Sequence, residues 1–268
     1  AALDVLDQLK REHPDKYEEL MTELDYREEE EHIRDLYENI YLPEPGANMV
    51  IEQFDGYLKG EDLSLEELYS RIIKPNEYLG SPTGLTVNTQ IIKQADVVLL
   101  MSLLGDLFTK KIKEKNWEYY EPRTEHGSSL STCIYALLSA QIGKTEWAYK
   151  YLMKAARIDL TGDYKLYLGD LYIGGTHPAA NGGTWMVVVQ GFAGLDIRDG
   201  GIKIDPHLPE KWEELKFGFG YSGSRYRAAV RKEEIEIRCE SLESTELKVT
   251  CRGNVYHCVP GQVLRIKY

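Results

Sequence analysis

The sequence predicts a mostly helical domain followed by a small β domain, and two observations support this prediction. From residue 1 to about residue 160, apolar side chains recur with the three- and four-residue spacing of amphipathic helices. From Leu195 onward, apolar and polar side chains alternate, which is typical of strands with one buried face. We therefore expect a helical domain over residues 1–194 and an antiparallel β domain over residues 195–268.

The first helices are expected near the start of the chain, where two apolar groups at positions 17–24 and 33–40 have helical spacing. The charged run between them, residues 27–31, is expected to form a solvated helix face. Residues 1–6 already show helical periodicity without a cap, which suggests a chain cut inside a larger fold.

Later helices follow from caps and apolar runs. Ser64 and Glu67 have the spacing of a capping box, which predicts a helix to about Ile73. Further helices are expected over residues 88–108, 134–142 and 145–158, the second of them buried and the last capped by Thr145. Six to eight helices are consistent with an α/α toroid but cannot close a twelve-helix barrel.

The strands begin with a hairpin signal at residues 196–204, which alternate around a turn containing Gly200 and Gly201. Further alternating strands are expected at residues 234–238, 246–250 and 263–267.

Composition excludes several classes of function. The net charge of −12 disfavours nucleic acid and anionic membranes as partners. No apolar run reaches the length of a membrane span, and no basic-then-apolar leader starts the chain. The four cysteines form no C-x-x-C pair, so we expect no metal site and reduced thiols in a cytoplasmic protein.

The most informative motif is HGSSLS at residues 126–131, directly before the buried helix. Backbone N–H groups and small hydroxyls at a helix start are suited to an anion, and His126, Ser128 and Ser129 add side-chain donors. The alternative is that Ser128 or Ser129 is only an N-cap.

A second glycine-rich stretch, NGGTW at residues 181–185, again precedes an apolar run. Gly182 and Gly183 let a backbone approach a ligand closely, and two such turns converging on one point would hold a phosphate. A loop that simply needs positive φ angles explains the same residues.

Lys93 and Gln94 lie inside the apolar run that predicts the 88–108 helix. A buried lysine needs a partner, and both side chains can hydrogen-bond sugar hydroxyls. A polar turn on the surface of an amphipathic helix is the other interpretation. No Ser-His-Asp arrangement, Walker loop, Rossmann glycine pattern or pair of acid and base carboxylates is convincing.

Taken together, these segments resemble the glycoside hydrolase family 65 phosphorylases, the group that acts on maltose, kojibiose, nigerose and trehalose. The resemblance covers nearly the whole chain, and its segments are specific only in combination. The matching segments are QFDGY at 53–57, KQAD at 93–96, YEPRTEHGSSLS at 120–131, GTHPAANGGTW at 175–185 and GFAGL at 191–195.

The resemblance implies the second half of an (α/α)6 barrel followed by a small C-terminal β-sandwich. It also implies an inverting reaction in which phosphate cleaves an α-glucosidic bond and β-glucose 1-phosphate is released. Lys93 and Gln94 would then contact the glucosyl unit. The phosphate would be bound by His126, Ser128, Ser129, Gly182 and Gly183.

The family's general acid is a Glu on a segment upstream of residue 1, so no catalytic acid is assigned within this chain, and the isolated chain is expected to be inactive. The implied partners are an α-linked glucose disaccharide, inorganic phosphate as co-substrate without other cofactors, the missing N-terminal half of the barrel and a second copy in a homodimer.

Two alternatives remain open. One is an α-glucoside hydrolase of the same fold, with Glu125 turned inward as the base that water requires. Because a carboxylate beside phosphate is repelled, phosphorolysis instead predicts that Glu125 points away or pairs with Arg123. The other alternative is a non-catalytic carbohydrate-binding fragment. The linkage cleaved is not specified by the sequence.

Overall fold

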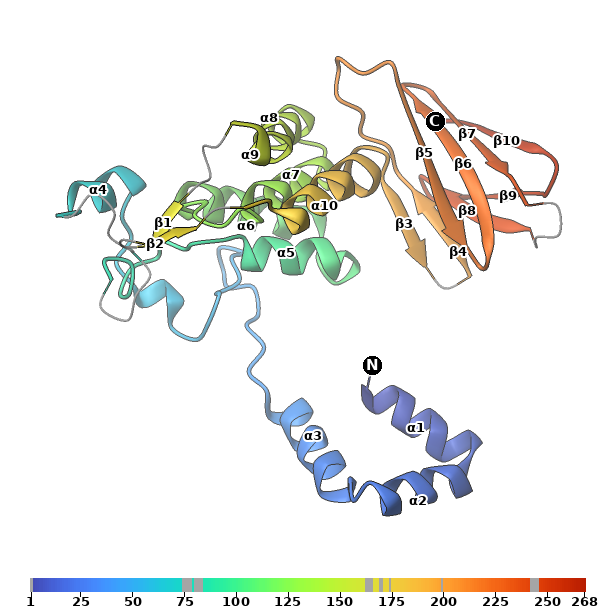
Figure 1. Ribbon diagram of the computed structural model, residues 1–268, viewed down its shortest axis with the longest axis horizontal. Helices are drawn as coiled ribbons and strands as arrows, with labels where there is room; N and C mark the ends of the chain where they lie inside the picture. Colours follow the sequence, from blue (N-terminus) through green and yellow to red (C-terminus); the bar gives the residue numbers. More distant parts are fainter. Residues whose placement is uncertain are drawn as a thin grey trace. The chain divides into compact units, whose positions relative to one another are not determined.

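The computed structural model describes residues 2–73, 79, 84–161, 166–168, 171–173, 175–198, 200–241 and 246–268 (Figure 1). By its internal contacts the chain divides into two compact units, Ala1–Glu44 and Pro45–Tyr268. The boundary predicted at residues 194 and 195 falls inside the second unit, where strand β3 begins at Leu195.

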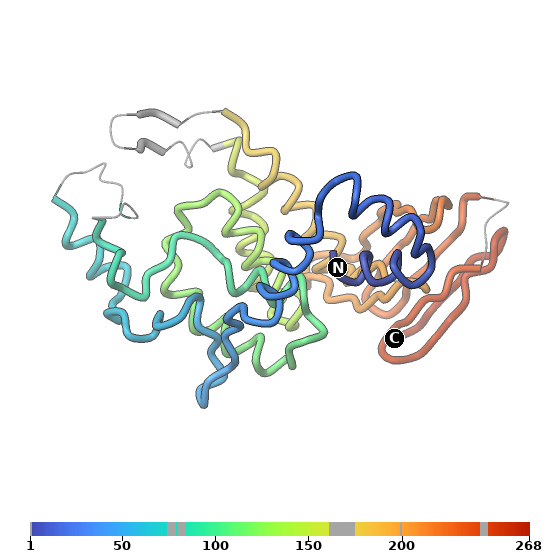
Figure 2. The backbone as a smooth tube through the Cα atoms, turned by 90° about the horizontal axis from the view of Figure 1, so that it is seen from below, coloured from blue at the N-terminus to red at the C-terminus, as the bar shows by residue number. Residues whose placement is uncertain are grey.

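The first unit consists of three helices, drawn in blue in Figure 2. Its small apolar centre comes mainly from Tyr17 and Met21 on the second helix, while the first helix has no buried residue. The helices are α1 (Ala2–Glu12), α2 (Pro14–Glu23) and α3 (Arg27–Asn39), which confirms helical structure at positions 17–23 and 33–39.

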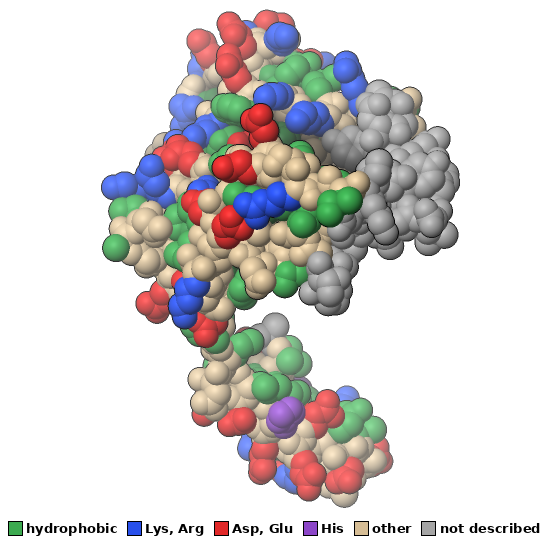
Figure 3. Space-filling view, turned by 90° about the vertical axis from the view of Figure 1, so that its left-hand side faces the viewer, with side chains coloured by type: hydrophobic (Ala, Val, Ile, Leu, Met, Phe, Trp, Pro, Cys, Tyr) green, Lys and Arg blue, Asp and Glu red, His purple; other side chains and the backbone are tan. Residues whose placement is uncertain are grey.

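The sequence predicted that the acidic run at the start of α3 is a solvated helix face, but one of its carboxylates is buried. Glu30 is buried, and its carboxylate accepts hydrogen bonds from the Tyr17 hydroxyl and from Arg34. These bonds hold the pKa of Glu30 below its usual range. The remaining carboxylates of the run are exposed, and Figure 3 shows acidic side chains gathered on the surface of this unit.

The helical part of the second unit is built around α7 (Ser131–Gln141), which is buried along nearly its whole length. Helices α5, α6, α8 and α10 and the π-helix η4 contact it. The other elements of this part are η1 (Tyr57–Lys59), α4 (Leu65–Ser70), α5 (Asp96–Leu103), η2 (Gly105–Leu107), α6 (Lys110–Tyr120), η3 (Glu121–Arg123), α8 (Thr145–Ala156), α9 (Ile158–Thr161), β1 (Leu166–Leu168), β2 (Leu171–Ile173), α10 (Pro178–Met186) and η4 (Val187–Phe192).

Local signals predicted two of these helices well. The Ser64 side chain accepts from the backbone N–H of Glu67, whose carboxylate accepts from Ser64, so the capping box of α4 is present. Helix α7 confirms the buried helix predicted at 134–142. Helix α4 ends at Ser70 rather than near residue 73, and Thr145 begins α8 without capping it.

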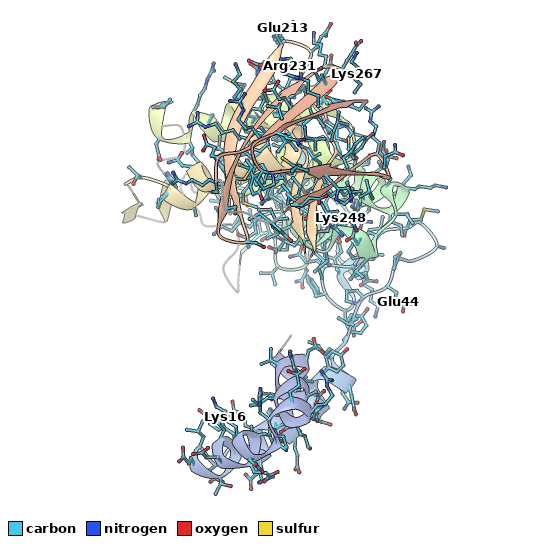
Figure 4. All side chains as sticks on the ribbon, turned by 90° about the vertical axis from the view of Figure 1, so that its right-hand side faces the viewer. Lys16, Glu44, Glu213, Arg231, Lys248 and Lys267 are labelled. Carbon is cyan, nitrogen blue, oxygen red and sulfur yellow. The ribbon has the colours of Figure 1, made fainter. Side chains whose placement is uncertain are left out.

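The β part has two four-stranded sheets, with strand orders β10-β7-β6-β5 and β3-β4-β8-β9. Figure 4 shows Glu213, Arg231 and Lys267 at one end of the β part, where β5 starts and β6 and β10 end. The strands are β3 (Leu195–Arg198), β4 (Gly201–Ile204), β5 (Glu214–Tyr221), β6 (Ser224–Arg231), β7 (Glu234–Cys239), β8 (Leu247–Cys251), β9 (Asn254–Cys258) and β10 (Val263–Lys267).

The predicted hairpin is confirmed by the antiparallel pairing of β3 with β4, in which Arg198 lies opposite Gly201. Positive φ angles at Gly200 and Gly201 make this turn possible, while Asp199 lies outside the described residues. The other pairings within the two four-stranded sheets are antiparallel, as expected, except that β4 and β8 pair in parallel. Strands β5, β6 and β9 were not predicted.

Two apolar cores meet within the second unit. One surrounds α7, the other lies between the two sheets, and Val188, Leu208 and Leu215 pack against both. All four cysteines are free and buried, and Cys133 occupies the first core as a small apolar side chain. Within the described residues, no helix has the length and apolar character needed to span a membrane.

Candidate functional site

Two distant stretches of chain lie side by side at the candidate site. The backbone N–H of Ile92 donates to the carbonyl of Arg123 at 2.9 Å, and the N–H of Glu125 donates to the carbonyl of Ile92 at 2.8 Å. These bonds form a parallel β-bridge between Ile92 and Thr124. The bridge sets the residues after Ile92 beside the start of the HGSSLS motif.

This pairing corrects the helix predicted over 88–108. Because the backbone at Ile92 bonds to another segment, it is not available for helical hydrogen bonds, and helix α5 begins only at Asp96. Lys93 and Gln94 therefore lie in a bend before the helix rather than inside it, with their side chains exposed.

Lys93 faces the residues before and after His126. A Cβ placed on Gly127 would lie 3.6 Å from Cγ of Lys93 and 3.7 Å from Oε1 of Glu125. Burial raises the pKa of the Glu125 carboxyl above its ordinary value, and the nearby Lys93 charge opposes this rise. Glu125 thus lies beside Lys93 and does not point away from the site.

The pairing of Glu125 with Arg123 is likewise not formed. Arg123 binds Asp62 with two hydrogen bonds, of 2.9 and 2.7 Å, in the fork geometry typical of an arginine–carboxylate pair. Its guanidinium also lies over the ring of Tyr119. Arg123 therefore has a structural role next to the site, where it joins the segments of Asp62 and Tyr119.

Gln94 belongs to a cluster of amides around the first residue of α5. The two carboxylate oxygens of Asp96 accept from Gln94 Nε2 at 3.0 Å and from Gln53 Nε2 at 3.1 Å. The buried Oε1 atom of Gln53 has no hydrogen-bond partner among the described residues. Phe54, beside Gln53, is 54% exposed. An aromatic ring beside amides and a carboxylate is a chemical set that can bind sugar hydroxyls.

His126 is held by partners on both sides of its ring. Its Nδ1 lies 2.8 Å from Oγ of Ser131, and its Nε2 lies 3.5 Å from the hydroxyl of Tyr151. Burial and the nearby charge of Lys154 lower the pKa of His126 to about 4, so the imidazole is neutral at pH 7. His126 also has a positive φ of 54°, an unusual conformation for a residue other than glycine.

Ser128 and Ser129 lie half-buried in the turn that leads into α7. The Ser128 carbonyl accepts from Ser131 N–H at 3.0 Å, and the residue in the N-cap position is Leu130. Neither serine is thus the N-cap. Among the described residues, no acceptor is hydrogen-bonded to the N–H groups of Gly127, Ser128 and Ser129. The turn is therefore chemically suited to an acceptor-rich ligand.

The glycine pair of the second motif is placed differently from the prediction. Gly182 and Gly183 lie inside helix α10, which begins four residues before Gly182, at Pro178. Proline fixes a helical φ and is favoured in this first position, so the helix starts earlier than the glycine signal suggested. The predicted turn at these glycines is wrong.

Gly183 nevertheless packs against the helix that follows the HGSSLS motif. A Cβ on Gly183 would lie 2.3 Å from Sγ of Cys133, in the first turn of α7, so this glycine allows close contact between α10 and α7. A Cβ on Gly182 would meet no atom within 4 Å. The first turn of α7, which directly follows the His126 loop, is therefore in contact with Gly183 of α10 but not with Gly182.

His177, within the GTHPAANGGTW segment, is the N-cap residue of α10. Asp159 accepts from its backbone N–H at 2.9 Å and lies 2.7 Å from its Nδ1, and it also accepts from Asn181. These bonds hold the pKa of Asp159 below its usual range. Because Asp159 is 18 positions from His177 in the sequence, no local pattern predicts this pair.

The described residues contain no cluster of three or more His, Cys, Asp or Glu side chains that could hold a metal ion. What they gather is one amine, Lys93, two amides and a turn of hydroxyl and N–H donors. This set can bind sugar hydroxyls and an anion at neighbouring positions.

Comparisons with known proteins agree with this arrangement of a helical part and a β part. Residues 1–186 match the "Glycosyl hydrolase family 65 central catalytic domain", and residues 195–258 match the "Glycosyl hydrolase family 65, C-terminal domain". The chain belongs to glycosyl hydrolase family 65.

Its relatives include several phosphorylases. The nigerose phosphorylase of Lachnoclostridium phytofermentans is 41% identical over 88% of this chain and 32% of its own length. The 1,2-alpha-glucosylglycerol phosphorylase of Bacillus selenitireducens is 44% identical over 82% of this chain and 29% of its own length. The kojibiose phosphorylase of Caldanaerobacter subterraneus is 37% identical over 92% of this chain and 32% of its own length. The chain thus spans about a third of the length of these relatives.

A solved structure shares the arrangement of a helical part followed by two sheets. The protein described as "Putative kojibiose phosphorylase from human microbiome" matches with a TM-score of 0.76 and 24% identity. The match covers 93% of this chain and 32% of the other.

Proposed function

We propose that this chain is part of an inverting α-glucoside phosphorylase that uses inorganic phosphate to cleave an α-linked glucose disaccharide and releases β-glucose 1-phosphate. The observation that carries the proposal is the hydrogen-bonded pairing at Ile92, which joins the Lys93 and Gln94 segment to the loop at 126–129. The phosphorylase names of relatives at 37 to 44% identity support the same class.

In this proposal Lys93 and Gln94 bind the glucosyl unit, and the 126–129 loop binds phosphate. Phosphate arrives already charged, so it needs positioning and charge stabilisation rather than a general base. Ser128 and Ser129 supply hydroxyl donors beside the N–H groups of the loop. His126 belongs to the same phosphate site.

Gly182 and Gly183 lie inside a helix, so they do not supply N–H donors to the phosphate site. They contribute instead because they have no side chain. The missing side chain of Gly183 brings α10 against α7, and that of Gly182 leaves room for a ligand. Both effects follow from the absence of a Cβ atom.

We propose that the remaining catalytic residues lie in a part of the protein outside these 268 residues. In this proposal the chain is the second half of an (α/α)6 barrel with its β-sandwich, which is supported by the relatives being about three times as long. The general acid, a Glu, is then contributed by the other half, and this chain alone is inactive. A homodimer remains a prediction.

The test is a chimera in which this chain replaces the matching third of the L. phytofermentans nigerose phosphorylase. Sugar release from nigerose is measured with and without phosphate. We expect release that saturates with phosphate, yields glucose 1-phosphate and falls at least tenfold in a Ser128→Ala/Ser129→Ala variant, the loss of about two hydrogen bonds to a charged ligand. Ser102→Ala is the control, because the Ser102 hydroxyl on α5 donates to the carbonyl of Val98 on the same helix. Equal release without phosphate would reject phosphorolysis.

Hydrolysis is the second candidate, and the position of Glu125 beside Lys93 favours it enough to be tested. As a general base, Glu125 would activate water. In the chimera, Glu125→Gln should leave phosphate-dependent release within about twofold if phosphorolysis is correct, because no base is used. A loss of roughly a hundredfold or more would identify Glu125 as a base and support the hydrolase instead.

A further inference from the structure

The ring of His126 lies at the centre of a chain of side-chain contacts that the proposed reaction does not use directly. The hydroxyl of Tyr151 on α8 donates to the carboxylate of Glu121, the first residue of η3. The same hydroxyl lies 3.5 Å from Nε2 of His126, whose Nδ1 lies 2.8 Å from Oγ of Ser131. The four side chains therefore form a continuous row of contacts that leads from η3 to the first residue of α7.

The chemistry of these groups sets the direction of every bond. A phenol has one proton, and Tyr151 gives it to Glu121, so the phenol oxygen can only accept from His126. A neutral imidazole carries a single proton, which must then be on Nε2. Nδ1 is left as an acceptor, and the hydroxyl of Ser131 donates to it.

Packing fixes the plane of the ring as well. The His126 ring lies 5.1 Å from the ring of Tyr135 and 5.4 Å from that of Tyr151. Tyr135 is fully buried on α7, and its hydroxyl lies 2.6 Å from that of Thr124. Lys154, over the ring of Tyr151, is the charged group whose field reaches the imidazole.

We propose that Glu121 and Tyr151 are positioning residues that fix His126 in its Nε2–H tautomer and thereby hold the loop at residues 126–129 in its phosphate-binding form. The inference rests on the proposed phosphate site. It means that both ring nitrogens of His126 are engaged by protein groups. Phosphate is therefore bound by the hydroxyls and N–H groups of residues 127–129, and His126 acts by shaping them.

The experiment reads the tautomer directly in the 268-residue chain with ¹⁵N-labelled histidine, by long-range ¹H–¹⁵N correlation at pH 7. The His126 signals are assigned from their loss in His126→Gln. We expect a proton on Nε2 and none on Nδ1. In Tyr151→Phe the Nε2 partner is gone, and we expect averaging between the two tautomers.

Glu121→Gln is the second variant, in case Tyr151→Phe does not fold. The new carboxamide can donate to the phenol oxygen and frees the phenol proton for Nε2, so an Nδ1–H population should appear. Tyr149→Phe is the matched control, because Tyr149 lies on the same helix, with its ring against Trp212. Phosphate affinity, followed by the amide signals of residues 127–129, should fall about fivefold in the two variants and not in the control.

An Nδ1–H tautomer in the unchanged chain, or a tautomer unaffected by both substitutions, overturns the inference. So does an altered tautomer with unchanged phosphate affinity, although the phosphate site then stands. A chain that binds no phosphate at residues 127–129 overturns the proposed site and the inference together.

Discussion

Gly182 and Gly183 are neighbours on one helix with opposite surroundings, and this contrast gives a sharp test at the scale of single residues. A Cβ on Gly183 would meet Sγ of Cys133 at 2.3 Å, so Gly183→Ala should destabilise the protein by about 1 to 3 kcal/mol through overpacking. Gly182→Ala meets nothing within 4 Å and should be neutral, or stabilising by up to about 1 kcal/mol, because alanine favours the helix.

Urea unfolding of the two variants measures this difference. Cys133→Ala combined with Gly183→Ala should recover most of the loss, because it removes the atom that the new methyl group meets. Equal stability of the two single variants would show that Gly183 is not needed for the contact between α10 and α7.

His126 makes the free energy of unfolding depend on pH. Its pKa is about 4 in the folded chain, against about 6.5 when unfolded, so the unfolded state binds the proton more readily. The stabilising effect of a neutral His126 is complete above pH 6.5 and is lost as the pH falls toward 4, by about 2 to 3 kcal/mol.

Comparison with His126→Gln separates the effect of His126 on the free energy of unfolding from the effect of the carboxylates, which titrate in both proteins. Between pH 7 and pH 4, the unchanged chain should lose more unfolding free energy than the variant, as measured by urea titration at each pH. Parallel pH curves for the two proteins would mean that His126 titrates normally in the folded state.

At the scale of elements, Asn116 on α6 fixes the loop segment that precedes Gln53 and Phe54. It is fully buried, its Oδ1 accepts from Ile51 N–H at 2.8 Å, and its Nδ2 donates to the carbonyl of Met49 at 2.7 Å. Asn116→Ala should cost about 2 to 3 kcal/mol, because a buried backbone N–H is left without a partner.

Lys115→Ala is the matched control, since Lys115 is the next residue on the same helix, is exposed, and forms a surface ion pair with Glu118. It should change the free energy of unfolding by less than about 1 kcal/mol. A cost for Asn116→Ala as small as that of Lys115→Ala, in the same urea titration, would contradict the anchoring role.

The elements also show what sequence can and cannot predict here. The capping box of α4 and the apolar run of α7 are local signals, and both helices are present. The helix expected over 88–108 is replaced in its first part by long-range hydrogen bonds at Ile92, which no local pattern reveals. Strand β5 was missed because Gly218 and Gly220 interrupt its outer face.

The same distinction holds for the site. Motifs identified Lys93, Gln94, Ser128 and Ser129 as candidates, and the structure brings their two segments together. The contacts of His126 with Tyr151 and of Asp159 with His177 join residues 25 and 18 positions apart. Such pairs are created by the packing of α8 and α9 and are not visible in either motif.

At the scale of the whole molecule, charge and burial differ between the two units. Residues 1–44 carry fifteen acidic and five basic side chains, so most of the net charge of −12 belongs to the first unit and the rest is nearly neutral. The unit that contains the candidate site therefore contributes little to the net negative charge that repels an anion.

The first unit should also be the less stable one. Its buried apolar side chains are few, Tyr17 and Met21, whereas nine residues of α7 are buried. Short helical segments with little buried area are marginal in water. In hydrogen exchange followed by mass spectrometry, α1 to α3 should exchange well before α7, and equal protection would contradict this.

Phosphate titration of the 268-residue chain, followed by backbone amide NMR at constant ionic strength, tests the central claim most directly. We predict saturable shifts concentrated at Gly127, Ser128 and Ser129 and in the first turn of α7, which chloride at the same ionic strength does not produce. Shifts absent from these residues, or spread evenly over exposed basic side chains, would contradict an anion site at this turn.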